Sequence, residues 1–380
     1  MFIVAYLYND NGMASWCWEA AHALHELGQP VLLICANEVK LPGTPEVDII
    51  RFNPESKEFI SKNIIARIAR EFHGLSSNSS GFTYELHKYL QQQNITPSAY
   101  FLNKSNLQDP RVNVPQYVVG WAYPTSLQGY ISKINRFAKG RSVIDFVREF
   151  LGSVGWWRKD WRSYRSATSV LPVSQKMGTE LISQGVKARV IYPGTFISTA
   201  KPCKHDQHLP KLLIAAQSLE ESRKGVAWMI DALKSGVHKK FSLTLVGKAS
   251  DTFKEWVCAD GFPAEFKGFV PRSQLQELMA EHDIFLFGSC LDDWGYVLVE
   301  AMSQGLSVVA PKISPFDEII GNSGVFYSLS SEKDFREKVF DLLDSDLLSL
   351  RTAAWERANK LFSRQAFGQS LLTTFLETKR

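Results

Sequence analysis

The chain has 380 residues, of which 45% are hydrophobic and 22% are charged, and its formal net charge is +4. This length suits two domains of ordinary size, and no stretch approaches the roughly 18 consecutive apolar residues that a membrane-spanning helix needs. The mild charge does not favour nucleic acid as a partner, and no nucleic-acid recognition motif accompanies it.

The N-terminal residues bear on the cellular location, and the cysteines bear on disulfides and metal binding. Met1 to Leu7 lack the basic region of a signal peptide and are typical of a buried strand, so we expect a cytoplasmic protein. The five cysteines are scattered, with no CxxC pair and no histidine at zinc spacing. This pattern indicates neither disulfides nor a structural metal site.

Short apolar runs alternate with amphipathic stretches through the first half of the chain. The runs that we predict as strands are Phe2–Leu7, Val31–Ala36, Val47–Phe52, Ala99–Leu102, Tyr117–Gly120, Ser169–Val173 and Arg189–Tyr192. Between the first two runs, one helical stripe ends at Gly28 and holds Ala14, Trp18, Ala21, Leu24 and Leu27. The alternation predicts a parallel sheet sandwiched by helices.

A second series begins after a break in the periodicity. Turn-forming residues between Pro193 and Lys211 predict an exposed connection and a domain boundary. The strands predicted beyond it are Leu212–Ala216, Ser242–Val246, Ala264–Phe269, Ile284–Phe287 and Ser307–Ala310. After about Ser349 the pattern is helical up to Lys379, and it predicts a helix pair that runs back over the first domain.

We therefore expect an α/β protein with two doubly wound, Rossmann-like domains that face a central cleft. The expected boundaries are residues 1–198 for the first domain, 199–355 for the second, and 356–380 for a C-terminal helix that crosses back to the first. In sheets of this kind ligands bind beyond the carboxyl ends of the strands, so the loops there are the places to search for a site.

The most informative stretch runs from Phe285 to Gly305, where a predicted strand leads through a polar loop into a helix. Free N–H groups at a helix start, aided by the helix dipole, bind anions such as a diphosphate. The candidate amides are those of Gly295, Tyr296, Val297 and Leu298. Asp292 precedes the helix and Glu300 lies inside it, and carboxylates accept hydrogen bonds from sugar hydroxyls. The alternative is a helix cap at Asp292 and a solvated Glu300.

This stretch resembles the ExxxxxxxE signature of retaining GT-B glycosyltransferases of family 4, the glycosyl transferases group 1. The residues in register with the signature are Ser289, Gly295, Glu300, Ala301, Met302 and Gly305. Three further segments resemble the family, and the resemblance covers the chain from about Lys211 onward. They are Leu245-Val246-Gly247, Lys267-Gly268-Phe269-Val270 and Phe316-Asp317-Glu318-Ile319-Ile320. The first half matches more loosely, through Asn11-Gly12-Met13, Ala167 to Ser174 and Tyr192-Pro193-Gly194.

The resemblance implies an activity and a set of residue roles. It implies transfer of a hexose-type sugar, with retention and without a metal ion, from a nucleotide-diphosphate sugar to a hydroxyl acceptor. No cofactor beyond that donor is implied. Glu300 would bind the donor ribose and Asp292 the donor sugar, and a basic residue after the first strand of the second domain would neutralise the diphosphate. Gly247 and Ser289 would lie on the donor side and Gly12 on the acceptor side.

Three departures from the family pattern concern the same site. Asp292 stands where the family usually has glutamate, which shortens the reach by one methylene. The family's Gly-Arg-Leu is absent from this chain, and the basic residues come later in the sequence. Lys224 fits the position of the family's lysine, and Arg223 is a candidate to replace the family's arginine. The alternative for this pair is an exposed, charged helix start. The family's histidine in the first domain is missing, and Trp121 in the corresponding stretch either takes its place or packs in the core.

The segment from Ile131 to Arg165 has nine basic residues against three acidic ones, interleaved with Trp156, Trp157 and Trp161. Such stretches dock on anionic lipid, so our hypothesis is that residues 131–165 make a peripheral contact with the inner face of an anionic membrane. The acceptor would then be a glycan or a lipid-linked substrate. The alternative is a packed helix with a solvated basic face.

A sugar-nucleotide epimerase, a phosphorylase and a catalytically inactive sugar-binding relative also stay open as functions of the chain, although the acidic pair Asp292 and Glu300 favours transfer over epimerisation.

Overall fold

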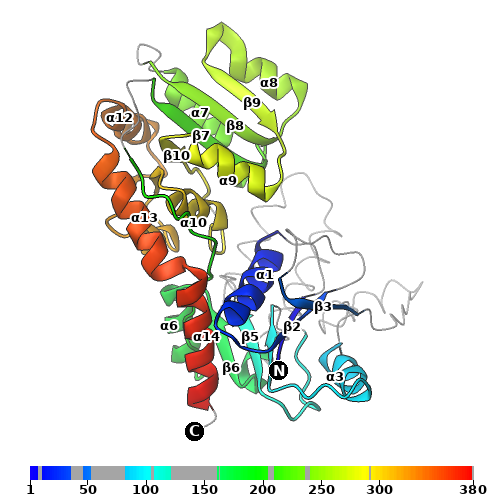
Figure 1. Cartoon of the computed structure of the whole chain (residues 1–380). Coiled ribbons are helices and arrows are strands. Elements are labelled where there is room, and N and C mark those ends of the chain that lie inside the picture. Colours follow the sequence, from blue (N-terminus) through cyan, green and yellow to red (C-terminus); the bar gives the residue numbers. More distant parts are fainter. Residues whose placement is uncertain are drawn as a thin grey trace, which may run out of the picture. The chain divides into compact units, whose positions relative to one another are not determined.

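The structure is a computed structural model that describes residues 1–6, 11–35, 46–52, 82–103, 107–120, 161, 163–203, 209–235, 240–290 and 292–378 (Figure 1). The chain forms two compact units. One comprises Met1–Gly194 with Phe367–Arg380, and the other comprises Thr195–Ala366. Each unit is built on a six-stranded sheet in which every recorded strand pair is parallel. The predicted α/β class with two doubly wound domains is confirmed.

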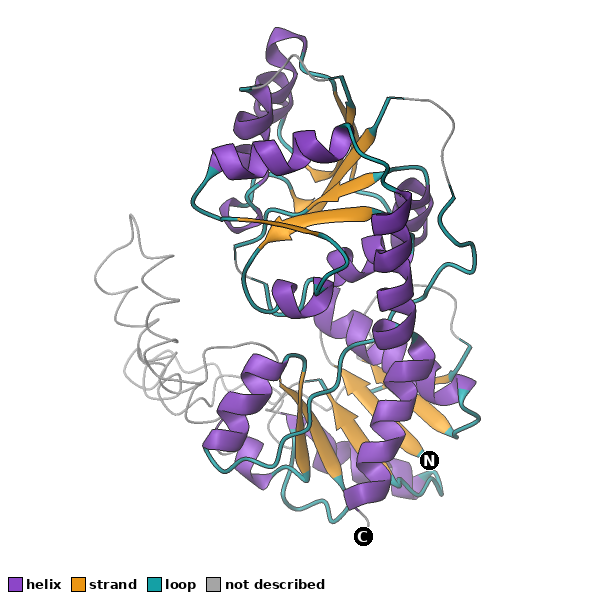
Figure 2. Ribbon diagram, turned by 90° about the vertical axis from the view of Figure 1, so that its left-hand side faces the viewer, coloured by secondary structure: helices purple, strands orange, loops and turns teal. Residues whose placement is uncertain are grey.

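The first sheet has the strand order β3-β2-β1-β4-β5-β6. Its strands are β1 (Phe2–Tyr6), β2 (Val31–Cys35), β3 (Asp48–Arg51), β4 (Ala99–Leu102), β5 (Gln116–Gly120) and β6 (Ser169–Pro172). The helices in the described part of the chain between these strands are α1 (Asn11–Glu26), α3 (Phe82–Gln92) and, after β6, α6 (Gln175–Ser183). Every residue of β2, β4, β5 and β6 is buried, as expected for a parallel sheet covered on both faces (Figure 2).

Helix α14 (Arg364–Thr378) joins this unit from the C-terminal end of the chain. The ring of Phe375 meets Phe2 edge-on, with the centroids 4.9 Å apart, and Phe367 meets Trp16 at 5.4 Å. At Gly368 the helix lies so close to α1 that a Cβ there would come 2.7 Å from the carbonyl oxygen of Ala23. The predicted return of the C-terminal helix to the first domain is confirmed.

The predicted strand Arg189–Tyr192 is wrong. No strand forms at Arg189–Tyr192, and the isolated bridge beside β6 is made by the preceding residue, Ala188, with Val170. The N–H groups of Arg189 and Ile191 donate to β6 carbonyls, at 2.9 and 3.0 Å. The ladder does not continue because Pro172, the last residue of β6, has no N–H to donate in return.

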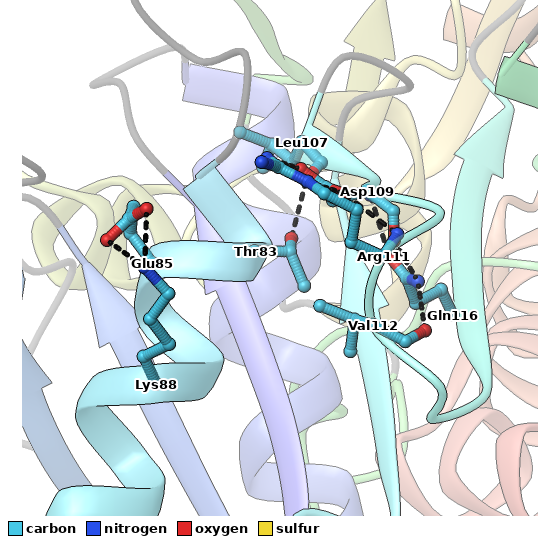
Figure 3. Close-up of polar contacts among 8 residues, drawn as sticks. All are labelled: Thr83, Glu85, Lys88, Leu107, Asp109, Arg111, Val112 and Gln116. Carbon is cyan, nitrogen blue, oxygen red and sulfur yellow. Dashed lines mark hydrogen bonds and ion pairs between the residues drawn. The ribbon is translucent and has the colours of Figure 1, made fainter.

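The connection from β4 to β5 is held by side-chain hydrogen bonds in its described part, 107–115 (Figure 3). The Gln116 amide donates to the carbonyl oxygens of Asp109 and Val112 at 2.7 and 3.2 Å, and it accepts from the Asp109 N–H. The guanidinium of Arg111 donates to the Asp109 carboxylate, and this bond lowers the pKa of that buried carboxyl. The Thr83 hydroxyl, at the start of α3, donates to the carbonyl of Leu107. These bonds fix the path of the chain between the two strands.

The second sheet has the order β12-β11-β10-β7-β8-β9. Its strands are β7 (Lys211–Ser218), β8 (Ser242–Lys248), β9 (Ala264–Gly268), β10 (Ile284–Leu286), β11 (Ser307–Pro311) and β12 (Val325–Tyr327). The helices are η2 (Ser222–Lys224), α7 (Val226–Lys234), α8 (Asp251–Cys258), η3 (Ala259–Gly261), α9 (Arg272–Ala280), α10 (Tyr296–Ser303), α11 (Phe316–Ile320), α12 (Glu332–Leu343) and α13 (Leu348–Phe362). All five predicted strands are present. β12 was not predicted because its three residues are too few to show a period.

A buried arginine ties α13 to the rest of the second unit. The Arg351 guanidinium donates to the carbonyls of Gly305 and Cys203 at 2.8 and 3.2 Å, and it lies 3.7 Å from the carboxylate of Asp283. Burial lowers the pKa of Arg351.

Among the described residues, no helix combines the length and the apolar character that crossing a bilayer requires.

Candidate functional site

Both sheets have a topological switch point between the first and the fourth strand of the unit. In the second unit these strands are β7 and β10, which lie side by side while the chain continues outward on either side of them. Ligands of open α/β sheets bind beyond the carboxyl ends of the strands at such a point. The loops that follow β7 and β10 hold five of the predicted site residues, which are Arg223, Lys224, Ser289, Asp292 and Gly295.

The two loops approach each other through their backbones. Gly225 has φ 64°, and a Cβ there would lie 2.4 Å from the carbonyl oxygen of Gly288. The Cys290 N–H donates to the carbonyl of Arg223 at 2.9 Å. Only glycine combines the left-handed conformation with this approach, so Gly225 sets the spacing of the two loops.

The side chains of these loops meet in an ion pair. Lys224 Nζ donates to Asp292 Oδ2 at 2.5 Å, and the two side chains are 16% and 22% exposed. The hydroxyl of the buried Ser289 lies 3.4 Å from the same oxygen. Arg223 reaches Asp292 Oδ1 only at 3.9 Å, while its Nε donates to Glu221. The alternative, an exposed and charged helix start, does not describe Lys224. This residue lies in the 3-10 turn η2 and pairs with Asp292 of the other loop.

Helix α10 begins after a glycine and not after a capping side chain. Its N-cap is Gly295, with φ 85° and no side-chain cap hydrogen bond. The predicted helix start is confirmed, and the alternative that Asp292 caps the helix is wrong. The Leu298 N–H already donates to the Gly295 carbonyl at 2.9 Å, so the helix-start amides left for an anion precede Leu298.

Glu300 is buried in α10, at 7% exposure, and the alternative of a solvated helix face is wrong. Its Oε1 accepts from Nε of Arg272 at 2.6 Å, and Nη2 of Arg272 donates to the Thr195 hydroxyl at 2.9 Å. Arg272 is the first residue of α9 and lies 28 positions from Glu300 in sequence. Sequence reasoning missed this residue, because no spacing rule links two residues that meet only through the fold.

Gly247 lies near the carboxyl end of β8. It has φ 148°, and a Cβ there would lie 2.0 Å from the carbonyl oxygen of Ala216 in β7. Beyond the neighbouring strand β9, the ring of Phe269 is 59% exposed, with the ammonium of Lys248 5.8 Å from its centroid. This edge of the sheet thus presents an exposed aromatic ring and a cation on the side of β7 opposite to β10.

The residues predicted for the acceptor side belong to the first unit. Gly12 is the second residue of α1, which begins at Asn11, so the segment Asn11-Gly12-Met13 lies in the first turn of the helix and not before it. Trp121 lies outside the described residues. So does the basic segment 131–165, apart from Trp161 and residues 163–165, in which the Arg165 guanidinium lies 5.6 Å from the Trp161 ring. Asn103, the residue after β4, is buried, and sequence reasoning did not single it out.

A cavity of about 680 Å³ opens at the carboxyl ends of β11 and β12. It is lined by Lys312, Ile313, Phe326, Tyr327, Ser328, Leu329, Ser330, Asp334 and Lys338. None of the described residues that were predicted for the donor site lines it. It is therefore a second place at this edge of the sheet where a ligand could lie.

Comparison with known proteins finds, within the second unit, the family that the sequence of this region resembles. Residues 210–345 match the family of glycosyl transferases group 1. A sulfoquinovosyl transferase of Arabidopsis thaliana is 26% identical over 196 residues, which cover 47% of this chain and 38% of that protein. The matches to the two curated relatives cover less than half of the length of those proteins.

Solved structures share the fold over nearly the whole chain. Sucrose-phosphate synthase of Thermosynechococcus elongatus matches with a TM-score of 0.71 and 14% identity, over 99% of this chain and 98% of that one. HepE of Anabaena, solved with UDP and glucose, matches with a TM-score of 0.64 and 17% identity, over 99% of both chains. Residues 210–345 of this chain are thus similar to the glycosyl transferases group 1, and its two units have the GT-B fold.

Proposed function

We propose that this chain is a retaining, metal-independent glycosyltransferase that moves a hexose-type sugar from a nucleotide-diphosphate sugar to a hydroxyl acceptor. The observation that carries the proposal is the convergence of cationic and acidic groups at the switch point of the second sheet. Lys224 and Asp292 meet there at 2.5 Å, next to the start of α10, and Glu300 lies further along the same helix. This is the layout that a diphosphate with a sugar at either end requires.

In the proposed complex the diphosphate replaces Asp292 as the partner of Lys224. The ammonium, with Arg223 and the helix-start amides, stabilises the negative charge that develops on the leaving phosphate. Asp292, released from Lys224, then accepts hydrogen bonds from hydroxyls of the donor sugar, while Glu300 accepts them from the ribose. Because the acceptor attacks on the face that the diphosphate leaves, the phosphate can take the acceptor's proton and no nucleophilic carboxylate is needed.

We further propose that residues 199–355 bind the donor and that residues 1–198, with Gly12 and Trp121, contribute to the acceptor side. UDP-sugars are the first donors to test, because HepE, which has the same fold, was solved with UDP and glucose. The exposed ring of Phe269, at the carboxyl edge of the same sheet, is a surface on which a nucleobase could stack.

The test is incubation of the protein with a panel of nucleotide sugars, followed by analysis of both products. Release of nucleotide that depends on the donor indicates transfer or hydrolysis, whereas an isomerised donor indicates an epimerase and binding without turnover indicates an inactive relative. Glu300→Ala should abolish release and leave the circular dichroism spectrum unchanged. Near-normal turnover in that variant would refute the role of Glu300.

For the acceptor, our proposal is a lipid-linked or glycolipid substrate reached at the inner face of an anionic membrane through residues 131–165. It rests on the basic and aromatic composition of that segment. Flotation with vesicles that contain acidic lipid should recover the wild-type protein, and neutralising Arg158 and Lys159 should weaken the recovery. Absence of binding to such vesicles would dispose of the proposal.

A further inference from the structure

Arg272 joins two fixed points of the second unit. Its Nε donates to Glu300 at 2.6 Å, and its Nη2 donates to the Thr195 hydroxyl at 2.9 Å. Thr195 is fully buried, and its own N–H donates to the carbonyl of Phe362 at 2.8 Å. The guanidinium plane is therefore held at two edges by partners that are themselves held by the fold.

The guanidinium of Arg272 thus lies beside the carboxylate of the buried Glu300. The ion pair is only partly open to water, with the side chains of Arg272 and Glu300 exposed by 19% and 9%. A carboxylate in such a place is stable in its charged form only when a cation or several donors compensate the lost hydration. Without Arg272, the Glu300 carboxylate loses the hydrogen bond that orients its Oε1, and a carboxylate that is less firmly oriented is a poorer acceptor for hydroxyl groups.

We propose that Arg272 is a positioning residue for the donor, which holds the Glu300 carboxylate in place so that the site selects a nucleotide with an intact ribose. This inference rests on the proposed function, in which Glu300 accepts hydrogen bonds from the ribose hydroxyls. Arg272 acts through Glu300 and contacts no reacting atom. Its loss removes the preference for ribose and leaves the recognition of the diphosphate, which belongs to Lys224 and the start of α10.

The experiment measures dissociation constants by calorimetry for UDP, GDP and ADP with the wild-type protein. The diphosphate that binds most tightly is then compared with its 2′-deoxy and 3′-deoxy forms. A hydrogen bond to a charged group that is lost without replacement weakens binding by about 10-fold or more, so the wild type should prefer the ribonucleotide by about that factor.

In Arg272→Gln we expect this preference to fall below about 3-fold, while the affinity for the deoxy forms stays within about 3-fold of wild type. Arg336→Met, on α12, is the matched control and should keep the wild-type preference. Thr195→Val removes only the second anchor of the guanidinium and should give an intermediate preference. It serves as the test if Arg272→Gln does not fold.

Two results would overturn the inference in different ways. Arg272→Gln and Thr195→Val with the full ribose preference, whatever their affinity, would reduce Arg272 to a structural residue and leave the proposed function intact. A wild-type protein that binds none of the three diphosphates would instead overturn the proposed function, and the role of Arg272 with it.

Discussion

Replacing Gly225 by alanine should separate the two loops that carry the proposed donor site. Gly225 has φ 64°, and the added Cβ would lie 2.4 Å from the carbonyl oxygen of Gly288. Carbon and oxygen atoms that are not bonded do not approach so closely, so the loops after β7 and β10 must move apart. The hydrogen bond from Cys290 to Arg223 and the pair of Lys224 with Asp292 span the same gap and should weaken.

The expected cost has two parts. A residue with a Cβ in the left-handed region costs about 1–2 kcal/mol, and forcing an extra carbon into a packed contact costs about 1–3 kcal/mol more. Gly261→Ala isolates the first part, since Gly261 has φ 70° and a Cβ there would meet no atom within 4 Å. The difference between the variants, about 1–3 kcal/mol, corresponds to a melting temperature about 2–12 °C lower for Gly225→Ala.

Both variants should be compared with the wild type by calorimetric melting and by titration with the nucleoside diphosphate that binds most tightly. Gly225→Ala should melt lower than Gly261→Ala and bind the diphosphate more weakly, whereas Gly261→Ala should bind it as the wild type does. Equal melting temperatures and equal affinities in the two variants would refute the idea that the close contact at Gly225 builds the site.

Three further predictions concern single side chains. Lys224→Met should lower the rate of transfer by about 100-fold or more, and Arg223→Met by less, because the Arg223 guanidinium lies 3.9 Å from Asp292 and Lys224 lies at 2.5 Å; equal rates in both variants would contradict this. Arg351→Met leaves Asp283 without its buried cation and should cost about 3–5 kcal/mol in a urea titration, against less than about 0.5 kcal/mol for the exposed Lys333→Met. Burial lowers the pKa of His282, so its contribution to stability is present above about pH 6.5, the usual value for the unfolded chain, and is lost as the pH falls through the lowered folded value. His282→Gln should therefore lose less stability than the wild type on acidification from about pH 7.5 to 5.5, and an unchanged slope would contradict the assignment.

Most of the fold could be predicted because parallel strands with both faces buried appear as short apolar runs. The exceptions have physical causes. Arg189–Tyr192 has the composition of a strand but faces Pro172, which cannot continue the ladder. β12 has three residues and no readable period, and its place beside β11 is a property of the packed sheet.

The candidate site could be predicted in part for a related reason. Asp292, Gly295 and Glu300 lie on one continuous stretch, so a helix-start pattern and a family signature bring them to notice together. The partners that fix these groups come from other elements. Lys224 reaches Asp292 from 68 positions away, and Arg272 reaches Glu300 from α9. Burial of Glu300 depends on the same packing, which no local pattern encodes.

The central claim is that the start of α10 receives the diphosphate of the donor. A crystal structure of the protein with a bound nucleoside diphosphate tests it most directly. We predict phosphate oxygens within about 3 Å of the amides that follow Gly295 and of Lys224 Nζ, with the ribose hydroxyls at Glu300. A nucleotide seated instead in the cavity beyond β11 and β12, with the start of α10 unoccupied, would contradict it.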